Sequence, residues 1–113
     1  MALEILENTE NGYHPLLHHE GWRVAIANYD SKWEKGNIMF MERHVLTDEV
    51  FVLLRGNAAL YIGEDRTLFP METGKIYNVK KGTWHNLCME YGAQVLIVEN
   101  DNTSRVNSEY CDF

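Results

Sequence analysis

Short runs of β-forming residues, each closed by turn residues, recur along the chain and constrain its fold more than any other feature. No segment carries an apolar stripe with the 3.6-residue period of a helix. Strands of this length and spacing predict an all-β sandwich or barrel. The run that contains Pro70 should lie at a sheet edge, because proline cannot donate to the strand ladder. The predicted strands span residues 22–29, 37–44, 49–55, 58–62, 67–71, 75–80, 84–91 and 94–100.

The length of 113 residues predicts one domain, residues 1–113, and leaves little room for a second. We expect the barrel core at about residues 22–100, followed by a polar tail over residues 101–113 that lies over the surface. A domain of this size buries a modest share of its surface. We therefore expect a homodimer.

The net charge of −7 excludes several classes of partner. It argues against a nucleic-acid binder, which needs a basic face, and against an anionic membrane surface. A small anionic substrate remains compatible, because a few local arginines or lysines would suffice. Residues 1–12 have no basic region and no long apolar run, so we expect no signal peptide, and no run in the sequence approaches the ~18 apolar residues that span a bilayer. We expect a soluble, cytoplasmic protein.

The other three histidines and the two cysteines give no further site. The segment with His14, His18 and His19 is predicted to be an exposed N-terminal loop, because Pro15 breaks any helix that would align these histidines. The chain's two cysteines form no CxxC pair, so no zinc ribbon or redox dithiol is expected.

Four residues in two central segments carry the chemistry. Glu42 and His44 are two apart on a predicted strand and share a face, and Glu49 opens the next strand after a short turn. His85 begins a later strand. If these side chains converge inside a barrel, two imidazoles and two carboxylates form a mixed nitrogen–oxygen site. Such a site suits a divalent metal ion such as Zn, Mn, Fe or Ni.

Plainer interpretations exist for the same residues. His44 and His85 could be core histidines satisfied by hydrogen bonds, and Glu49 could be a surface charge at a strand start. Each lies at a fixed spacing from other ionisable groups, which favours a site. Glu42 stays open among three roles: metal ligand, general base, and partner for Arg43 of another chain.

Strand parity also predicts an outward apolar face. Phe40 should point inside with Glu42 and His44, because side chains two apart share a face. The outward residues of that strand are then Met39, Met41 and Arg43. In the strand over residues 84–91, one face should hold His85, Leu87 and Met89, and the other Trp84, Asn86 and Cys88. Outward apolar side chains would suit sheet-on-sheet packing in a dimer.

The spacing of the first segment resembles a motif of the cupin family. That motif is His-x-His, three or four residues, Glu, six residues and Gly. Here Glu42-x-His44 is followed after four residues by Glu49 and after six more by Gly56, so Glu42 replaces the first histidine.

The second segment resembles the second cupin motif, which is Gly, five residues, Pro-x-Gly, two residues, His, three residues and Asn. Gly74, Gly82 and His85 match it, whereas Lys80 replaces the proline and Met89 the asparagine. The resemblance implies a cupin-type double-stranded β-helix, a jelly-roll-like barrel that often pairs as a dimer. It also implies that the metal ligands are His44, Glu49 and His85.

A narrower resemblance is to the ureidoglycolate lyases, cupin-type enzymes that split ureidoglycolate into glyoxylate and urea. It rests on the phrases MERH at 41–44 and YNVKKGTWHNL at 77–87, in a chain shorter than those enzymes. The resemblance implies a carbon–nitrogen lyase. Because ureidoglycolate is a hemiaminal, our hypothesis is that an ion on His44, Glu49 and His85 binds the substrate hydroxyl and that Glu42 is the candidate base. A basic side chain would hold the substrate carboxylate; the candidates are Arg23, Arg55 and Lys80. The alternative is a non-catalytic module that binds a small polar metabolite or a metal.

Overall fold

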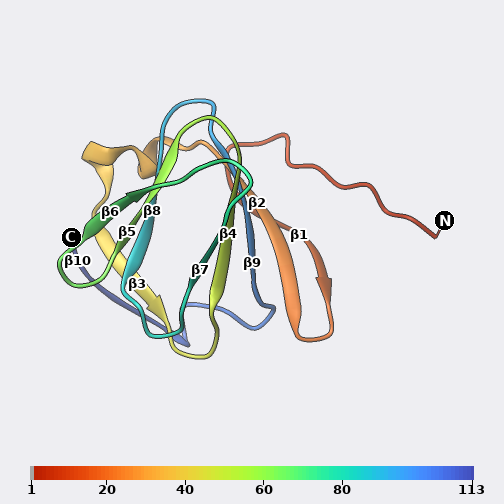
Figure 1. Ribbon diagram of the computed structural model, residues 1–113. Coiled ribbons are helices and arrows are strands. Elements are labelled where there is room, and N and C mark those ends of the chain that lie inside the picture. Colours follow the sequence, from red (N-terminus) through yellow and green to blue (C-terminus); the bar gives the residue numbers. More distant parts are fainter. Residues whose placement is uncertain (1) are drawn as a thin grey trace.

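The computed structural model describes residues 2–113 as two five-stranded sheets packed face to face, with antiparallel pairing throughout (Figure 1). The first sheet has the order β1-β2-β9-β4-β7 and the second β10-β3-β8-β5-β6. The strands are β1 (Gly12–His19), β2 (Trp22–Asn28), β3 (Phe40–His44), β4 (Glu49–Arg55), β5 (Ala58–Ile62), β6 (Thr67–Pro70), β7 (Ile76–Val79), β8 (His85–Met89), β9 (Gln94–Asn100) and β10 (Ser108–Asp112). Two short 3-10 helices, η1 (Ser31–Trp33) and η2 (Lys35–Asn37), lie between β2 and β3. Among residues 2–113, no helix is long and apolar enough to cross a membrane. The prediction of an all-β fold is confirmed.

The predicted strands correspond closely to the observed ones. β4, β5 and β9 have the predicted bounds, and β6, which contains Pro70, is an edge strand as expected. The run over residues 37–44 is shorter than predicted, since β3 begins at Phe40. The residues before it form η1 and η2, and the Asp30 side chain starts η1 by accepting a hydrogen bond from the Lys32 N–H at 3.0 Å.

Two strands lie outside the expected core of residues 22–100. The segment with His14, His18 and His19 is not a loop, because it forms β1 and pairs with β2. The tail is in part a strand as well, since β10 pairs with β3. Both are edge strands, where backbone hydrogen bonds to one neighbour suffice. Pro15 is tolerated in β1 because it lies at an edge and beside a β-bulge.

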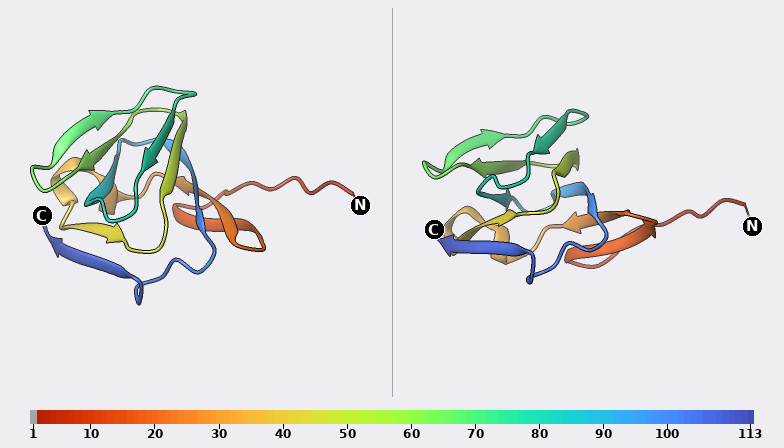
Figure 2. Two further views of the ribbon diagram at one scale, coloured as in Figure 1. Left: turned by 60° about the horizontal axis from the view of Figure 1, so that its bottom comes forward. Right: turned by 90° about the horizontal axis from the view of Figure 1, so that it is seen from below.

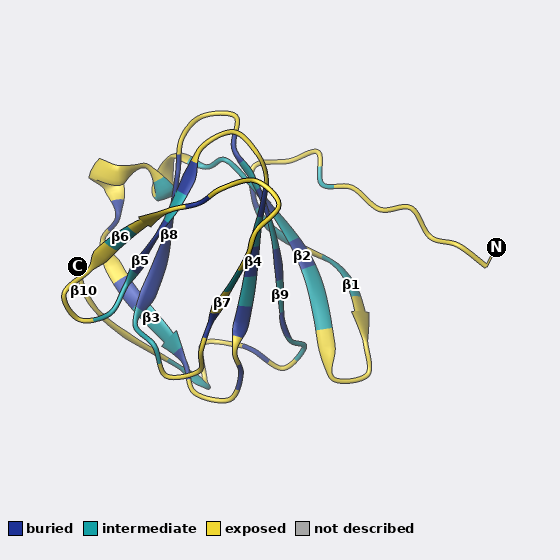
Figure 3. Ribbon diagram, viewed as in Figure 1, coloured by how far each residue is buried: buried dark blue, intermediate teal, exposed yellow. Residues whose placement is uncertain are grey.

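The space between the two sheets holds the main hydrophobic core, which we call the barrel core. Figure 3 shows that β4, β5 and β8 contain buried stretches, and residues of all three strands belong to this core. Leu87 and Met89 of β8 belong to the barrel core, whereas Cys88 lies in a second cluster on the opposite face. The predicted alternation is therefore confirmed for Leu87, Cys88 and Met89, whereas Asn86 lines the same cavity as His85 and Leu87. The buried members of the barrel core are Ala25, Ala27, Phe51, Leu53, Ala58, Leu60, Met71, Val79, Leu87, Met89, Ala93, Val95 and Ile97.

The prediction that Met41 is available to a partner is wrong. Met41 is 1% exposed and packs with Ile38, Tyr61 and Cys88 in a second cluster on the outer face of the second sheet. Trp33 of η1 packs against this cluster, so the chain covers that face with its own residues. Strand parity placed Met41 outward correctly, but parity cannot tell whether another segment covers the outward side.

The outer face of the first sheet is also apolar, and its side chains are only partly buried by the described residues. Residues that alternate with the buried barrel-core residues point away from the barrel. They form two cross-strand rows of partly or fully exposed aliphatic side chains: Val24, Val98 and Val50 in one row, and Ile26, Leu96, Val52 and Ile76 in the other. Figure 2 shows this sheet and the N-terminal segment that extends from β1 away from the barrel.

Candidate metal centre

The four residues singled out in the sequence come from three strands, two of the second sheet and one of the first. Glu42 and His44 lie on β3, Glu49 opens β4, and His85 opens β8. Glu42 pairs directly with His85 across β3 and β8. The Gly82 N–H donates a hydrogen bond of 2.8 Å to the His44 carbonyl, and Gly82 has a φ of 79°, which favours glycine. This turn therefore holds His85 beside His44.

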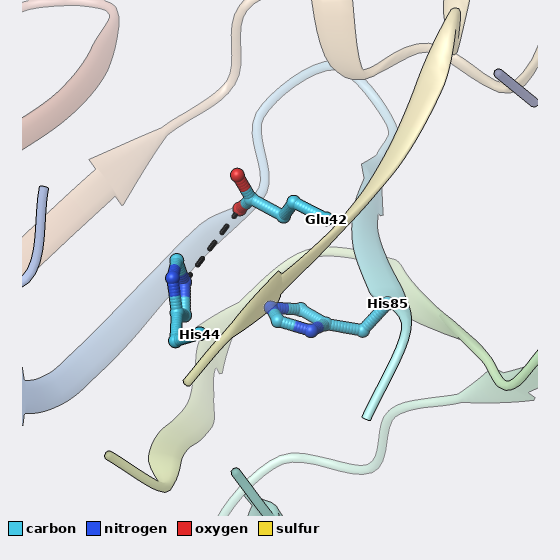
Figure 4. A group of neighbouring side chains, drawn as sticks. All are labelled: Glu42, His44 and His85. Carbon is cyan, nitrogen blue, oxygen red and sulfur yellow. Dashed lines mark ion pairs between the residues drawn. The ribbon is translucent and has the colours of Figure 1, made fainter. Parts of the chain in front are cut away.

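Glu49 lies between the two imidazole rings. Its Oε1 is 3.0 Å from His44 Nε2 and 2.9 Å from His85 Nε2. Glu42 Oε1 is 3.9 Å from His44 Nε2, and Figure 4 shows Glu42, His44 and His85 facing the same space. Glu49, His44 and His85 are buried, whereas 27% of the Glu42 side chain is exposed. The four side chains line one cavity.

The hydrogen bonds on the outer nitrogens fix the tautomer of each neutral ring. His85 Nδ1 is 2.9 Å from the Thr83 carbonyl, which can only accept, so Nδ1 carries a proton. His44 Nδ1 is 2.7 Å from Ser108 Oγ, and that hydroxyl donates to the Ser104 carbonyl at 2.7 Å. His44 Nδ1 is therefore also the donor. Both neutral imidazoles present an Nε2 lone pair to the same Glu49 oxygen.

Two lone pairs and a carboxylate oxygen at these distances repel one another unless a positive charge lies among them. That charge is either a proton on an imidazole or a metal ion bound by the nitrogens and the oxygen. Metal-binding histidines ordinarily donate their other N–H to a carbonyl, a carboxylate or water. His44 and His85 have this arrangement, so the centre is built to hold positive charge.

The pKa values show the same preference for positive charge. Burial lowers the pKa of His44 and of His85, but the hydrogen bond and the negative charge of Glu49 outweigh it, and both values are raised. Burial alone would raise the pKa of Glu49, yet the two histidines hold it below its usual range. Burial raises the pKa of Glu42, although the nearby histidines oppose this.

The donor atoms fit a divalent cation. Two imidazole nitrogens and several carboxylate oxygens form the mixed set that Zn, Mn, Fe and Ni accept. The ligand atoms of Glu42, His44 and His85 lie within 4.8 Å of one another, as do those of His44, Glu49 and Glu99. One buried oxygen of this set, Glu99 Oε2, has no hydrogen-bond partner among residues 2–113. A cation would satisfy it.

Sequence reasoning missed Glu99. It lies on β9, where Val95 and Ile97 alternate with it on the inward face. Its Oε1 accepts hydrogen bonds from Tyr13 Oη at 2.6 Å and from Arg23 Nη2 at 2.8 Å. Burial raises the pKa of Glu99 and of Tyr13. The signal was present in the run QVLIVEN, where parity puts a glutamate at the end of an apolar inward face.

The cavity around these residues has a volume of about 510 Å³. Its walls include the apolar side chains of Phe51, Leu87 and Ile97, and its lining also includes the basic residues Lys32 and Arg105. Phe40, which parity placed inside with Glu42, lines the cavity but is 42% exposed. The cavity lining thus combines acidic, apolar and basic side chains.

Three basic residues were predicted as candidates to hold a substrate carboxylate, and the structure places them differently. Arg23 lines the cavity, but its guanidinium is bonded to Glu99, to Tyr13 and to the Asp101 carbonyl. Arg55 is not part of the cavity lining, and Lys80 lines a separate hollow of about 370 Å³. The candidacies of Arg55 and Lys80 are therefore wrong.

Comparisons with known proteins identify the fold. No protein-family model and no curated protein sequence matches the chain. A cupin-2 domain protein from Shewanella frigidimarina is 18% identical, with a TM-score of 0.63 over 83% of this chain and 84% of its own. Pac13 of Streptomyces, described as a unique nucleoside dehydratase, is 10% identical, with a TM-score of 0.67 over 94% and 83%. An RmlC-like cupin with a double-stranded β-helix fold from Methanocaldococcus jannaschii is 10% identical, with a TM-score of 0.63 over 88% and 92%.

Identities of this size establish the fold alone. The chain is a cupin-type double-stranded β-helix, which confirms the predicted fold class. The comparisons provide no evidence for the narrower resemblance to ureidoglycolate lyases.

Proposed function

We propose that this cupin-fold chain binds a divalent metal ion in its barrel through His44, Glu49 and His85, and takes a small polar metabolite beside it. The observation that carries the proposal is the direction of the two rings. Each Nδ1–H is fixed by an acceptor, so both Nε2 lone pairs converge on one oxygen of Glu49. Zn, Mn, Fe and Ni are the candidate ions.

The shape and charge of the cavity support a small anionic metabolite. A volume of about 510 Å³ suits a compact ligand. Lys32 and Arg105 line the same cavity as the three glutamates at the centre. A carboxylate of the ligand would therefore have cationic partners while its hydroxyl faced the metal position. Arg23 is less suited to this role, because Glu99 already holds it.

Elemental analysis of the purified chain tests the proposal. We expect close to one ion per chain after incubation with Zn, Mn, Fe or Ni salts, and a lower melting temperature after treatment with a chelator, because an ion that binds only the folded state stabilises it. Restoring the ion should restore the melting temperature. A chain that retains none of the four ions, and whose melting is unmoved by each of them, would contradict the proposal.

A metal-dependent lyase is the catalytic form of this function, and the exposure of Glu42 favours it. Glu42 faces the cavity, has 27% of its side chain exposed, and receives no hydrogen bond from the described residues. A hemiaminal such as ureidoglycolate breaks down when a base removes the hydroxyl proton, the carbonyl forms, and the C–N electron pair leaves with a urea nitrogen that takes up a proton. A bound divalent ion would lower the pKa of the hydroxyl. The non-catalytic alternative binds the same ion and metabolite without turnover.

We also propose that the chain pairs as a homodimer through the outer face of the first sheet. The aliphatic rows on β2, β9 and β4 carry no charged residue in their centre, and β1 and β7 extend the face on both sides. A second copy presents the same rows, so the contact is self-complementary. The N-terminal segment leaves the edge of this sheet anchored by Asn8, which donates to the Ile26 carbonyl at 2.9 Å, and it ends in the exposed Leu3 and Ile5 (Figure 1). It can reach a partner across this edge.

Replacing Val52 with lysine should convert the dimer into a monomer, because it places a charge in the centre of the aliphatic rows. Light scattering at tens of micromolar should give twice the 13.2 kDa of one chain for the wild type and 13.2 kDa for the variant. Val106→Lys is the matched control, since Val106 is 97% exposed and lies outside the strands. A monomeric wild type would count against the proposal.

A further inference from the structure

Glu99 brings a buried carboxylate to the metal centre from a strand that neither cupin-like motif includes. Only 3% of its side chain is exposed. Tyr13 and Arg23 both donate to Oε1. Oε2 lies 3.9 Å from His44 Nε2, which is too long for a hydrogen bond, and has no partner among residues 2–113. A buried carboxylate oxygen without a partner requires an explanation.

We propose that Glu99 is a further ligand of the metal ion, with Oε2 as the donor atom and Arg23 and Tyr13 as the residues that position it. The inference rests on the proposed function, because it needs an ion on His44 and Glu49. It adds a ligand from β9 to those of β3, β4 and β8.

The arrangement of donors determines which oxygen is available. Arg23 is itself anchored, because its Nε donates to Tyr13 Oη at 3.1 Å and its Nη1 to the Asp101 carbonyl at 3.2 Å. Hydrogen bonds therefore fix Oε1 of Glu99, and Oε2 lies on the side of His44. This geometry predicts ligation by one oxygen only.

The charges of the centre are consistent with this assignment. Arg23 neutralises Glu99 within the pair, which leaves the carboxylates of Glu42 and Glu49 for the two charges of a divalent ion. In the absence of any ion, Glu99 and Glu49 bring their oxygens within 4.8 Å of the same His44 nitrogen and repel each other. An ion bound by both removes that repulsion.

Replacement of Glu99 by glutamine tests the proposal with Co²⁺ as the probe. The amide oxygen can still accept from Tyr13 and Arg23, but an NH₂ group takes the place of Oε2 and cannot bind a cation. We expect Co²⁺ to bind roughly 10–100-fold more weakly. The visible absorption bands of bound Co²⁺ should also change, because they depend on the number and kind of ligands. The metal-free variant should melt at a lower temperature than the metal-free wild type, because Arg23 loses its charged partner; the readout is therefore the binding of Co²⁺ and not the melting temperature.

Two further variants separate ligation from a structural role. Tyr13→Phe removes one of the hydrogen bonds that position Oε1 but leaves Oε2, so it should weaken Co²⁺ binding less than Glu99→Gln does. Glu90→Gln, at an exposed position, should leave the affinity for Co²⁺ and its spectrum unchanged. Wild-type affinity and an unchanged spectrum in Glu99→Gln, with binding lost in His85→Ala, would overturn this inference alone. A wild type that binds no Co²⁺, Zn²⁺ or Mn²⁺ would overturn the proposed function with it.

Discussion

Replacing His85 with alanine should strip the metal ion from the chain and lower its thermal stability. The variant loses one of two Nε2 donors and the ring that links β8 to Glu49. When the free ion is at about 100 times its Kd, an ion that binds only the folded state adds about 2.7 kcal/mol to stability. For a domain of this size, loss of that contribution lowers the melting temperature by roughly 10 °C. His44→Ala should act in the same way.

Treatment with a chelator tests whether this loss of thermal stability comes from the loss of the ion. After both proteins are treated with chelator, the difference in melting temperature should shrink, because neither then holds the ion. His18→Ala is the control, since 74% of the His18 side chain is exposed and it lies on β1, outside the cavity lining. If the two melting curves differ equally with and without chelator, His85 stabilises the barrel by packing and not as a ligand.

Replacing Glu42 with glutamine should leave the metal in place and lower turnover by roughly 10²–10⁴-fold, the usual effect of removing a general base. The amide keeps the size of the side chain but cannot take a proton. Burial raises the pKa of Glu42, which makes its carboxylate a stronger base than an exposed glutamate. The assay measures glyoxylate released from ureidoglycolate, together with the metal content of each protein.

Each result of this experiment leads to a different role for Glu42. Loss of activity with full metal content identifies a base, and loss of both identifies a ligand. Glu109→Gln serves as control, because Glu109 is exposed and pairs with Arg43 on the opposite side of β3 from Glu42. A wild type that binds metal but releases no glyoxylate would rule out ureidoglycolate as the substrate and favour the non-catalytic module.

The local alternation of apolar and polar residues was sufficient to predict the central strands of the barrel. In β4 the residues Glu49, Phe51 and Leu53 alternate with partly or fully exposed neighbours, and the predicted bounds are the observed ones. The side-chain period of a strand is two, so a single sequence reveals which residues share a face. The edge strands β1 and β10 were not predicted, because their side chains show no clear alternation of buried and exposed residues. Backbone hydrogen bonds to a single neighbouring strand hold them in place.

The positions of the four candidate site residues also followed from the sequence. Their spacing matched the cupin-like motifs, and strand parity put Glu42 and His44 on one face. What remained open was whether the other two side chains reach the same point. Register decides that: Glu42 lies opposite His85 across β3 and β8, and a glycine turn ties β8 to the end of β3.

The sequence by itself determined the all-β class, the main strands and the residue types at the centre, because these depend on periods of a few residues. Only the tertiary structure decided which nitrogen of each histidine faces inward, that Met41 is covered, and that Arg23 is held by Glu99. The Tyr13–Glu99 hydrogen bond joins residues 86 positions apart. Contacts of this kind depend on how whole sheets pack and pair, and no local pattern of side chains encodes them.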